Sequence, residues 1–153
     1  MMIIDEKKTT PNDELFSAIE AILNENYEVQ FTVTGNSMRP LLSHGRDSVI
    51  VERCDKSDLK KGDIVLLRAA EGRYLLHRIK VIKDELICTA GDANSFTDGF
   101  FPKDAVIAKV KKIVRKGKTH DMNEPSLQIY GKIWLSLYPI RPQVIKIAKK
   151  IKK

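Results

Sequence analysis

The sequence predicts a mainly β protein of the α+β class, with an antiparallel β barrel or sandwich core between an N-terminal helix and a C-terminal helical appendage. The chain of 153 residues has the length of one domain with a buried core. Several short β-type runs follow one another, and helical patterns occur only at the two ends. We therefore expect an N-terminal helix within residues 1–28, a β domain over 29–118 and a basic helical extension over 119–153.

The segment before the β runs carries the start signals of a helix. Thr10 can cap it, and Pro11 suits the first helical position because proline lacks the N–H that would go unpaired there. Apolar residues then follow at helical spacing, namely Leu15, Ile19, Ile22 and Leu23. We predict an amphipathic helix over residues 11 to about 26, with its apolar face packed on the core.

The β domain is predicted from short runs that alternate polar and apolar residues or are rich in β-branched side chains. Residues 30–34 form the first predicted strand, which ends at Gly35. The further predicted strands are residues 48–52, 63–67, 75–82, 85–89 and 106–114. Turns rich in Gly, Asp, Asn and Lys separate these runs, as expected for an antiparallel arrangement with short connections.

Two helices are expected after the β domain. Pro125 marks the start of the first, which runs through Trp134 to Tyr138 and is stopped by Pro139. The second begins at Pro142 and sets a stripe of Val and Ile against lysines. Its composition is typical of an interfacial membrane anchor and equally of a helix that packs its stripe on the domain, so both interpretations stay open.

The net charge suits three kinds of partner. Twenty-seven basic and 20 acidic residues give a formal charge of +7, with the excess in the last third of the chain. Such a charge is typical of binding to nucleic acid or to an anionic membrane surface, or simply of a basic tail. The strands lack the exposed aromatic residues that β barrels use to stack bases, so we expect no specific nucleic acid.

Localisation is inferred from two features that the sequence lacks. No uncharged stretch is long enough to cross a bilayer, and the first residues have no signal-peptide core. We therefore expect the protein in the cytoplasm. The basic C-terminal helix could also bring the protein into peripheral contact with the anionic inner face of the cell membrane, and this possibility stays open.

No metal or other cofactor is expected. Cys54 and Cys88 have no neighbouring His or Cys at metal-ligand spacing, and Cys88 lies in an apolar run typical of a buried thiol. The acidic segment from Gly91 to Asp98 superficially resembles a calcium loop. Lys103 stands where such a loop needs a bidentate glutamate, which excludes calcium.

Ser37 occupies a position suited to a nucleophile. It lies in the run Gly35-Asn36-Ser37-Met38-Arg39-Pro40, directly after the first predicted strand. A serine at a strand end, on a turn that glycine permits, can present both its hydroxyl and its backbone N–H to a substrate. A serine in a Gly/Pro turn is by itself far more often a turn residue, so the rest of the chain must decide.

Four short blocks occur in order between residues 30 and 114. They are Gly35-x-Ser37-Met38-x-Pro40, Lys61-Gly62-Asp63-Ile64-Val65, His77-Arg78-Ile79 and Gly91-Asp92-Ala93-Asn94-x-x-x-Asp98. In this order they resemble the signal peptidase I family of serine proteases. There the blocks are the nucleophile motif, a glycine-aspartate turn before a core strand, the base-bearing strand and a loop with acidic residues. The resemblance implies a signal-peptidase-like β core.

The resemblance implies a role for each polar residue. Ser37 is the nucleophile, His77 the general base, Asp98 the acid that orients the imidazole and Asp92 a supporting acid in the same loop. Which of the two acids orients His77 stays open. Histidine at the base position resembles the endoplasmic-reticulum and archaeal type, because the bacterial type has lysine there. The chemistry agrees, since a serine hydroxyl needs a base that is neutral near pH 7, and the imidazolium formed needs a carboxylate partner.

The substrate implied by the resemblance is an extended peptide paired to a strand edge, which we expect at residues 30–34, with shallow pockets for small side chains. The expected substrate-binding residues are Phe31, Thr32, Val33, Thr34, Gly35, Asn36 and Met38. For the oxyanion we expect the Ser37 N–H. Gly35 has no hydroxyl to offer, so Asn36 or a second backbone N–H must contribute.

The sequence departs from the family at its start. Residues 13–27 are charged and amphipathic where family members have a membrane helix. We therefore expect a serine endopeptidase that cleaves a precursor, leader or signal peptide. Two alternatives stay open: a self-cleaving protease, and a basic β-barrel module that binds nucleic acid through the lysines of residues 103–118.

Overall fold

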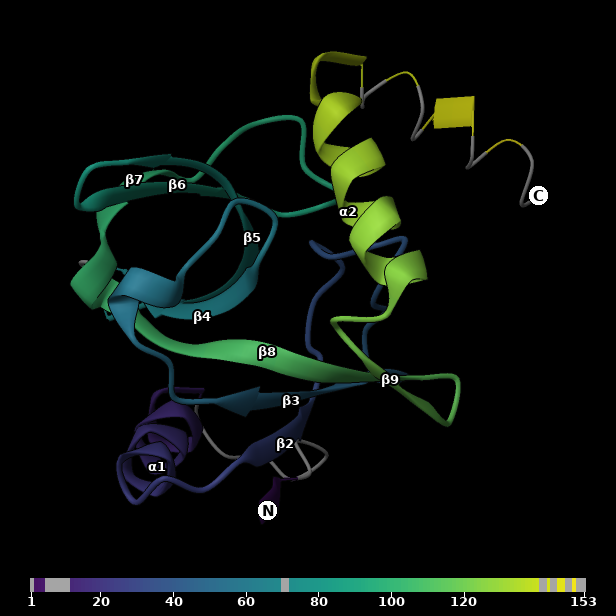
Figure 1. Ribbon diagram of the computed structural model, residues 1–153. Helices are drawn as coiled ribbons and strands as arrows, with labels where there is room; N and C mark the ends of the chain where they lie inside the picture. Colours follow the sequence, from purple (N-terminus) through teal and green to yellow (C-terminus); the bar gives the residue numbers. More distant parts are fainter. Residues whose placement is uncertain are drawn as a thin grey trace.

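One mostly antiparallel sheet forms the body of the protein in the computed structural model, which describes residues 2–4, 12–69, 72–140, 143, 146, 147 and 150 (Figure 1). Within these residues the sheet has nine strands, and two α-helices accompany it. The strands are β1 (Met2–Ile4), β2 (Val29–Thr32), β3 (Ser48–Glu52), β4 (Ile64–Arg68), β5 (Tyr74–Lys83), β6 (Leu86–Ala90), β7 (Gly99–Pro102), β8 (Val106–Arg115) and β9 (Lys118–Asp121). The helices are α1 (Asn12–Asn24) and α2 (Pro125–Ser136).

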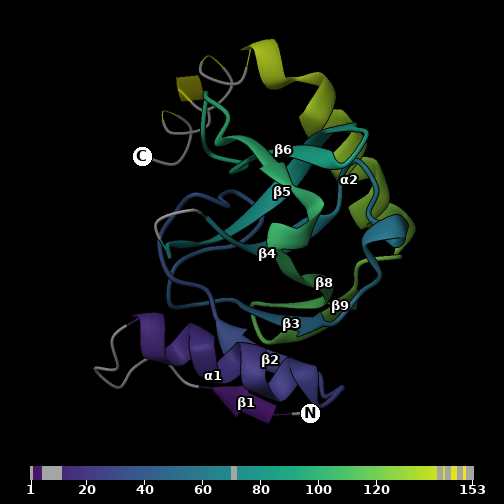
Figure 2. The same ribbon diagram turned by 90° about the vertical axis from the view of Figure 1, so that its left-hand side faces the viewer.

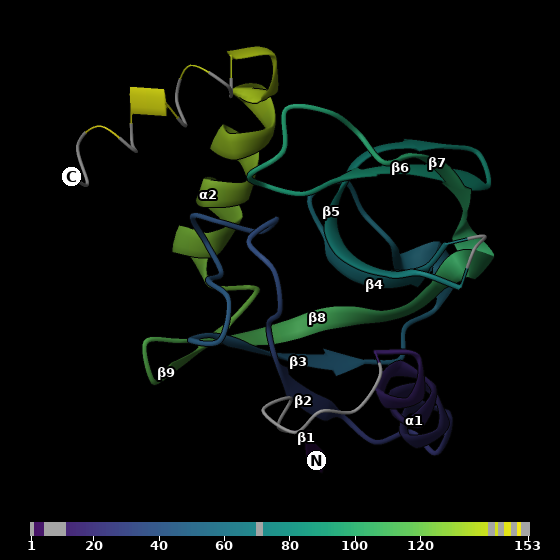
Figure 3. The same cartoon turned by 180° about the vertical axis from the view of Figure 1, so that it is seen from behind.

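The mainly β, α+β class is confirmed, and the sheet is open, so the predicted barrel does not close. The strand order is β1-β2-β3-β8-β4-β5-β6-β7, with β9 on β8, and the two end strands do not pair with each other. Register shifts in the β3–β8, β4–β8 and β5–β6 pairs bend the strands, as bulges do. The sheet therefore coils without closing: β4 stays paired with β8, and β5 to β7 curl away from β8 and β3 (Figures 1 and 3).

The predicted strands are found, with boundaries shifted by about one or two residues. They correspond to β2, β3, β4, β5, β6 and β8. The sequence pattern missed β1, β7 and β9. These strands have three or four residues each, too few for a periodic pattern, and each is paired along one edge of a longer strand.

Helix α1 packs on the sheet beside β2 (Figure 2). Its predicted apolar face is the buried one, with Leu15, Ile19 and Leu23 in the main core. Phe16 stacks on the ring of Tyr74 at 4.6 Å and meets Phe31 edge-on at 5.8 Å. The helix thus bridges β2 and the start of β5, the two strands that lead to the candidate site.

Helix α2 begins at Pro125 as predicted, and a 3₁₀ turn (Tyr138–Ile140) follows it. Trp134 is buried, which fixes the helix to the domain. The helix expected from Pro142 lies largely outside the described residues. None of the helices that the structure describes is long and apolar enough to span a membrane.

Candidate active site

The turn that carries Ser37 is shaped by its neighbours. Gly35 has φ +78°, in the left-handed region that glycine adopts at no steric cost, and its N–H donates to Nδ1 of His44 at 2.8 Å. Met38 is almost fully buried, so the residue after Ser37 anchors the turn in the core. Ser37 itself stays half-buried at the surface of the domain. The His44 contact could not be predicted from local patterns, because it depends on how the loop folds back.

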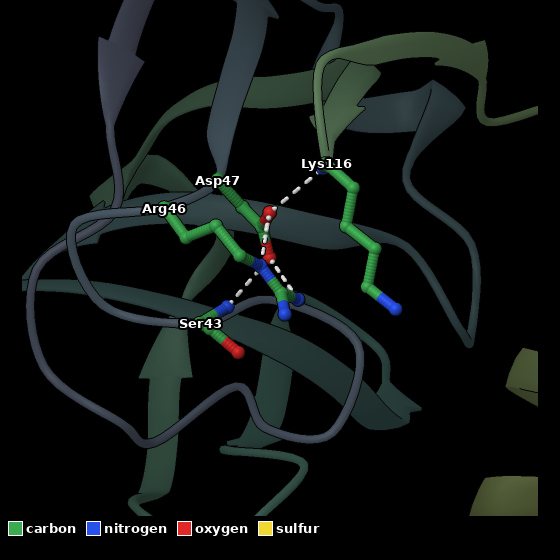
Figure 4. Close-up of polar contacts among 4 residues, drawn as sticks. All are labelled: Ser43, Arg46, Asp47 and Lys116. Carbon is green, nitrogen blue, oxygen red and sulfur yellow. Dashed lines mark hydrogen bonds and ion pairs between the residues drawn. The ribbon is translucent and has the colours of Figure 1, made fainter.

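Asp47 ties both ends of this loop together (Figure 4). Its fully buried carboxylate accepts from the Ser43 N–H at 2.8 Å, from the Lys116 N–H at 3.2 Å and from two nitrogens of Arg46 at 2.9 Å. Its backbone carbonyl accepts from the Val33 N–H at 2.8 Å. Asp47 therefore joins the nucleophile loop to the β8–β9 turn through its side chain, and to the end of β2 through its backbone.

The environment of Asp47 keeps it ionised. Burial by itself would raise the pKa of this carboxyl, because the charged form is poorly solvated. The hydrogen bonds from Arg46 and from the N–H groups of Ser43 and Lys116 favour the charged form and outweigh burial, so the pKa lies below its usual value.

Three side chains form a continuous hydrogen-bonded row. Nε2 of His77, on β5, lies 3.0 Å from Oγ of Ser37, a residue forty positions away in the chain. Nδ1 of His77 lies 2.5 Å from Oδ2 of Asp98, in the loop between β6 and β7. The Thr89 hydroxyl donates to the same Asp98 oxygen at 2.8 Å. The row has the geometry needed to move a proton from the serine hydroxyl to an imidazole oriented by a carboxylate.

Of the two acids in this loop, only Asp98 meets the His77 imidazole, and Asp92 lies elsewhere. Its carboxylate accepts two hydrogen bonds from Arg78, at 2.8 and 2.9 Å, and the two side chains are 0% and 2% exposed. Successive residues of a strand point to opposite faces, so Arg78 directs its side chain away from the face of His77. Asp92 follows Arg78 to that side.

The Arg78 guanidinium is held in place from several sides. Another of its nitrogens donates to the Gly62 carbonyl at 3.0 Å, and it lies 5.7 Å from the centre of the Tyr130 ring. Burial by itself would lower its pKa, but the hydrogen bonds and charge of Asp92 outweigh burial and raise it. The ion pair is therefore a charged, fully buried structural link.

The loop after β6 touches the nucleophile turn directly. The Ala93 N–H donates to the Ser37 carbonyl at 2.9 Å, and the Trp134 indole donates to the Asp92 carbonyl at 2.7 Å. A Cβ on Gly91 would come within 2.6 Å of the Ser37 carbonyl oxygen. The approach of these two segments therefore requires glycine at position 91.

A pocket of about 130 Å³ opens beside Ser37 and His77. Its lining is Phe16, Phe31, Val33, Thr34, Ser37, Met38, Tyr74, Leu75, Leu76 and His77. Four of the expected substrate-binding residues line it, whereas Thr32, Gly35 and Asn36 do not. Phe16 and residues 74–76 were not predicted as part of the site. In the sequence they belong only to the apolar patterns of a helix and a strand, which indicate secondary structure and not a pocket. Larger pockets beside Cys54 and Arg115 contain no residue of the Ser37–His77–Asp98 row.

The expected free edge at residues 30–34 is only partly open. β1 pairs in parallel with β2 and covers Val29, Gln30 and Phe31, so a free edge at Gln30 and Phe31 is wrong. The described strands leave this edge open only from Thr32 to Thr34. The three-residue β1 strand, far from β2 in sequence, gave no signal that could have predicted this pairing.

The cysteines and the possible metal ligands complete the inventory of reactive groups. Cys88 is buried as predicted, and Cys54 is half-buried, where burial raises the pKa of its thiol. Among the described residues, no three His, Cys, Asp or Glu side chains are grouped so that they could hold a metal ion.

Comparison of the sequence with models of known protein families gives no match, and comparison with curated proteins gives no significant match. A functional assignment therefore depends on the geometry of the site.

We predict that Asp47→Asn destabilises the fold by about 1–3 kcal/mol at neutral pH, because the buried side chain at position 47 loses the charge that accepts hydrogen bonds from Arg46, Ser43 and Lys116. Because the pKa of Asp47 is lower in the folded than in the unfolded protein, the carboxylate stabilises the fold at pH values above the usual carboxyl pKa. That stabilisation is lost as the pH falls through the pKa of the folded state. The difference between wild type and variant in urea unfolding should therefore shrink in acid. The exposed Asp104→Asn serves as control, and equal stability of wild type and Asp47→Asn at neutral pH would contradict the prediction.

A second prediction concerns the contact at Gly91. Gly91→Ala should lower the free energy of unfolding by about 1–3 kcal/mol, because the new methyl group must push back the Ser37 carbonyl. Urea unfolding measures the loss, and Ser95→Ala, an exposed change in the same loop, is the matched control. An unchanged unfolding midpoint in Gly91→Ala would show that the two segments do not meet as described.

Proposed function

We propose that the protein is a serine endopeptidase of the signal-peptidase type, which cleaves a precursor, leader or signal peptide. The observation that carries the proposal is the row from Ser37 Oγ through both ring nitrogens of His77 to Asp98. His77 is 5% exposed, so little bulk water competes for its nitrogens. A hydroxyl, an imidazole and a carboxylate in this order are the parts needed for acyl transfer at neutral pH.

In the proposed reaction, Ser37 Oγ attacks the carbonyl carbon of the scissile peptide bond, and His77 Nε2 takes the hydroxyl proton. The Asp98 carboxylate accepts a hydrogen bond from the Nδ1–H of His77 and stabilises the imidazolium. His77 then gives its proton to the leaving amine, and the C–N bond breaks to leave an ester on Ser37. A water molecule, deprotonated by His77, hydrolyses that ester and restores the hydroxyl.

The oxyanion of the tetrahedral intermediate needs donors beside Ser37. No described residue accepts a hydrogen bond from the Ser37 N–H, so this group is free to serve. Asn36 is exposed on the same turn and is the second candidate through its side chain. One preorganised donor is worth roughly 3 kcal/mol of transition-state stabilisation.

The peptide substrate would lie between β2 and β5. The N–H and C=O of Val33 bond to Asp47 and Gly45, on the β3 side. Backbone groups of successive strand residues point to alternate edges, so those of Thr32 and Thr34 face the cleft. On β5, the backbone of Ile79 bonds to Asp63 and Gly62, on the β4 side. By the same alternation, the N–H and C=O of Leu76 point to the opposite edge and face the cleft.

The side chains of the cleft favour a small apolar group next to the cut. The pocket is about 130 Å³, and seven of its ten lining residues are aliphatic or carry a benzene ring, the other three being Thr34, Ser37 and His77. It has room for a side chain of the size of alanine or valine and none for a charged one without a partner. Contact of the basic C-terminal segment with an anionic membrane, which would bring the enzyme to precursors there, belongs to the same proposal.

We predict that Ser37→Ala abolishes processing in cells while the protein stays folded, because the half-buried hydroxyl carries no core packing. A proteomic comparison of new N-termini in cells with wild type and with Ser37→Ala measures it. Ser95→Ala, exposed and outside the row, is the control and should match wild type. Identical N-termini in wild-type and Ser37→Ala cells would refute the proposed activity.

A further inference from the structure

A second pocket lies behind the turn that carries Ser37. Its volume is about 260 Å³, larger than the pocket of about 130 Å³ beside Ser37. Ser37 and Met38 line the pocket of the proposed active site, whereas Pro40 and Leu41 line the second one. The Leu42 N–H donates to the Met38 carbonyl at 2.9 Å and closes the turn. One short turn therefore forms part of the wall of both pockets.

Strand β8 and helix α2 supply the rest of the wall of the second pocket. Ile113 and Arg115 are two residues apart on β8, so their side chains lie on the same face of the strand, and both line the pocket. Leu127 and Tyr130, near the start of α2, line it as well. The loop between β2 and β3 lies beside α2 (Figures 1 and 3). Five of the eight lining residues are apolar or aromatic.

Arg115 brings an unpaired positive charge to this apolar pocket. Its Nε is buried and has no hydrogen-bond partner among the described residues. Asp47 accepts a hydrogen bond from the N–H of the neighbouring Lys116, but its carboxylate is bound by Arg46 and not by Arg115. A buried polar group without a partner is costly, and a guanidinium binds anions strongly. The pocket therefore favours a ligand that carries a negative charge.

The other ionisable group in the lining is already engaged. Nδ1 of His120 lies 3.2 Å from Oε2 of Glu124, whose other oxygen accepts from the Asp121 N–H at 3.3 Å. No carboxylate of the described part of the chain lines the pocket itself. Arg115 is therefore the group that would meet an anion, and the apolar side chains would hold the rest of the ligand.

Tyr130 connects this pocket to the proposed active site by a second route. Its ring stacks on Trp134 at 6.0 Å, and the Trp134 indole donates to the Asp92 carbonyl at 2.7 Å. The next residue, Ala93, donates its N–H to the Ser37 carbonyl at 2.9 Å. A ligand that fixes the Tyr130 ring therefore also acts on the loop that contacts the nucleophile turn.

We propose that this pocket binds a small apolar carboxylic acid, whose carboxylate pairs with Arg115, and that the bound acid regulates Ser37 by holding the turn between the two pockets. The planar guanidinium matches a carboxylate in charge and geometry. A volume of about 260 Å³ suits one acyl chain or one apolar side chain. A ligand that binds the described conformation of the turn raises its population. The regulatory part rests on the proposed function, whereas ligand binding does not.

NMR spectra of the isotope-labelled full chain, titrated with octanoate, test the binding. We expect saturable shifts of the N–H signals of Leu41, Ile113 and Leu127, with a Kd of roughly 1 mM. Octanol has the same chain without the charge and should bind at least roughly tenfold more weakly. Shifts confined to Thr34 and His77 would place the acid in the active-site pocket and overturn the inference.

Two variants and a control locate the binding. Arg115→Met keeps an apolar stem and removes the charge, so octanoate affinity should fall at least roughly tenfold. Ser126→Phe places a ring at an exposed position of the lining and should abolish binding. Lys118→Met removes an exposed charge at the position paired with Arg115 and should match wild type. Equal affinity of wild type and Arg115→Met, or no saturable shift in wild type, would overturn the inference.

The rate at which a fluorophosphonate reacts with Ser37, measured with and without saturating octanoate, tests the regulatory part. We expect octanoate to raise the wild-type rate roughly twofold or more and to leave the rate of Ser126→Phe unchanged. An unchanged or lowered wild-type rate would overturn the regulation of Ser37 alone. No adduct at Ser37 under any condition would contradict the proposed function, and the NMR titration would still decide whether the pocket binds the acid.

Discussion

The buried ion pair between Arg78 and Asp92 is the constraint on which the site depends. Taking two charges out of water is costly, and such a pair is tolerated only when its hydrogen bonds are satisfied. Here Asp92 accepts two bonds from Arg78, and Gly62 accepts a third. The pair fixes the loop after β6 against β5, and that loop carries both the Ala93 contact to the nucleophile turn and Asp98.

The adjacent β5 residues His77 and Arg78 thus act on opposite faces of the sheet. On one face His77 meets Ser37 and Asp98, and on the other Arg78 anchors the loop and packs against α2. Asp47 performs the matching task for the nucleophile turn, since it ties that loop to β2 and to the β8–β9 turn (Figure 4). Two buried carboxylates in structural roles therefore support one carboxylate in the proposed catalytic row.

Local patterns predicted the elements that have a period or a turn signal of their own. The main strands, α1, the start of α2, and the residues that form the polar row could all be named from sequence. What depends on non-local pairing could not. Asp92 pairs with Arg78 because the Arg78 side chain points to the face opposite His77. The sheet stays open because bulges bend its strands. The edge of β2 is blocked by β1, a three-residue strand that precedes α1 in the chain.

Reaction of Ser37 with a small fluorophosphonate, followed by intact-protein and peptide mass spectrometry, tests the central claim most directly. If His77 activates the hydroxyl, wild-type protein forms one adduct at Ser37, and His77→Gln reacts at least roughly a hundredfold more slowly. No adduct, an adduct at another serine, or equal rates in wild type and His77→Gln would show that this row does not make a nucleophile of Ser37.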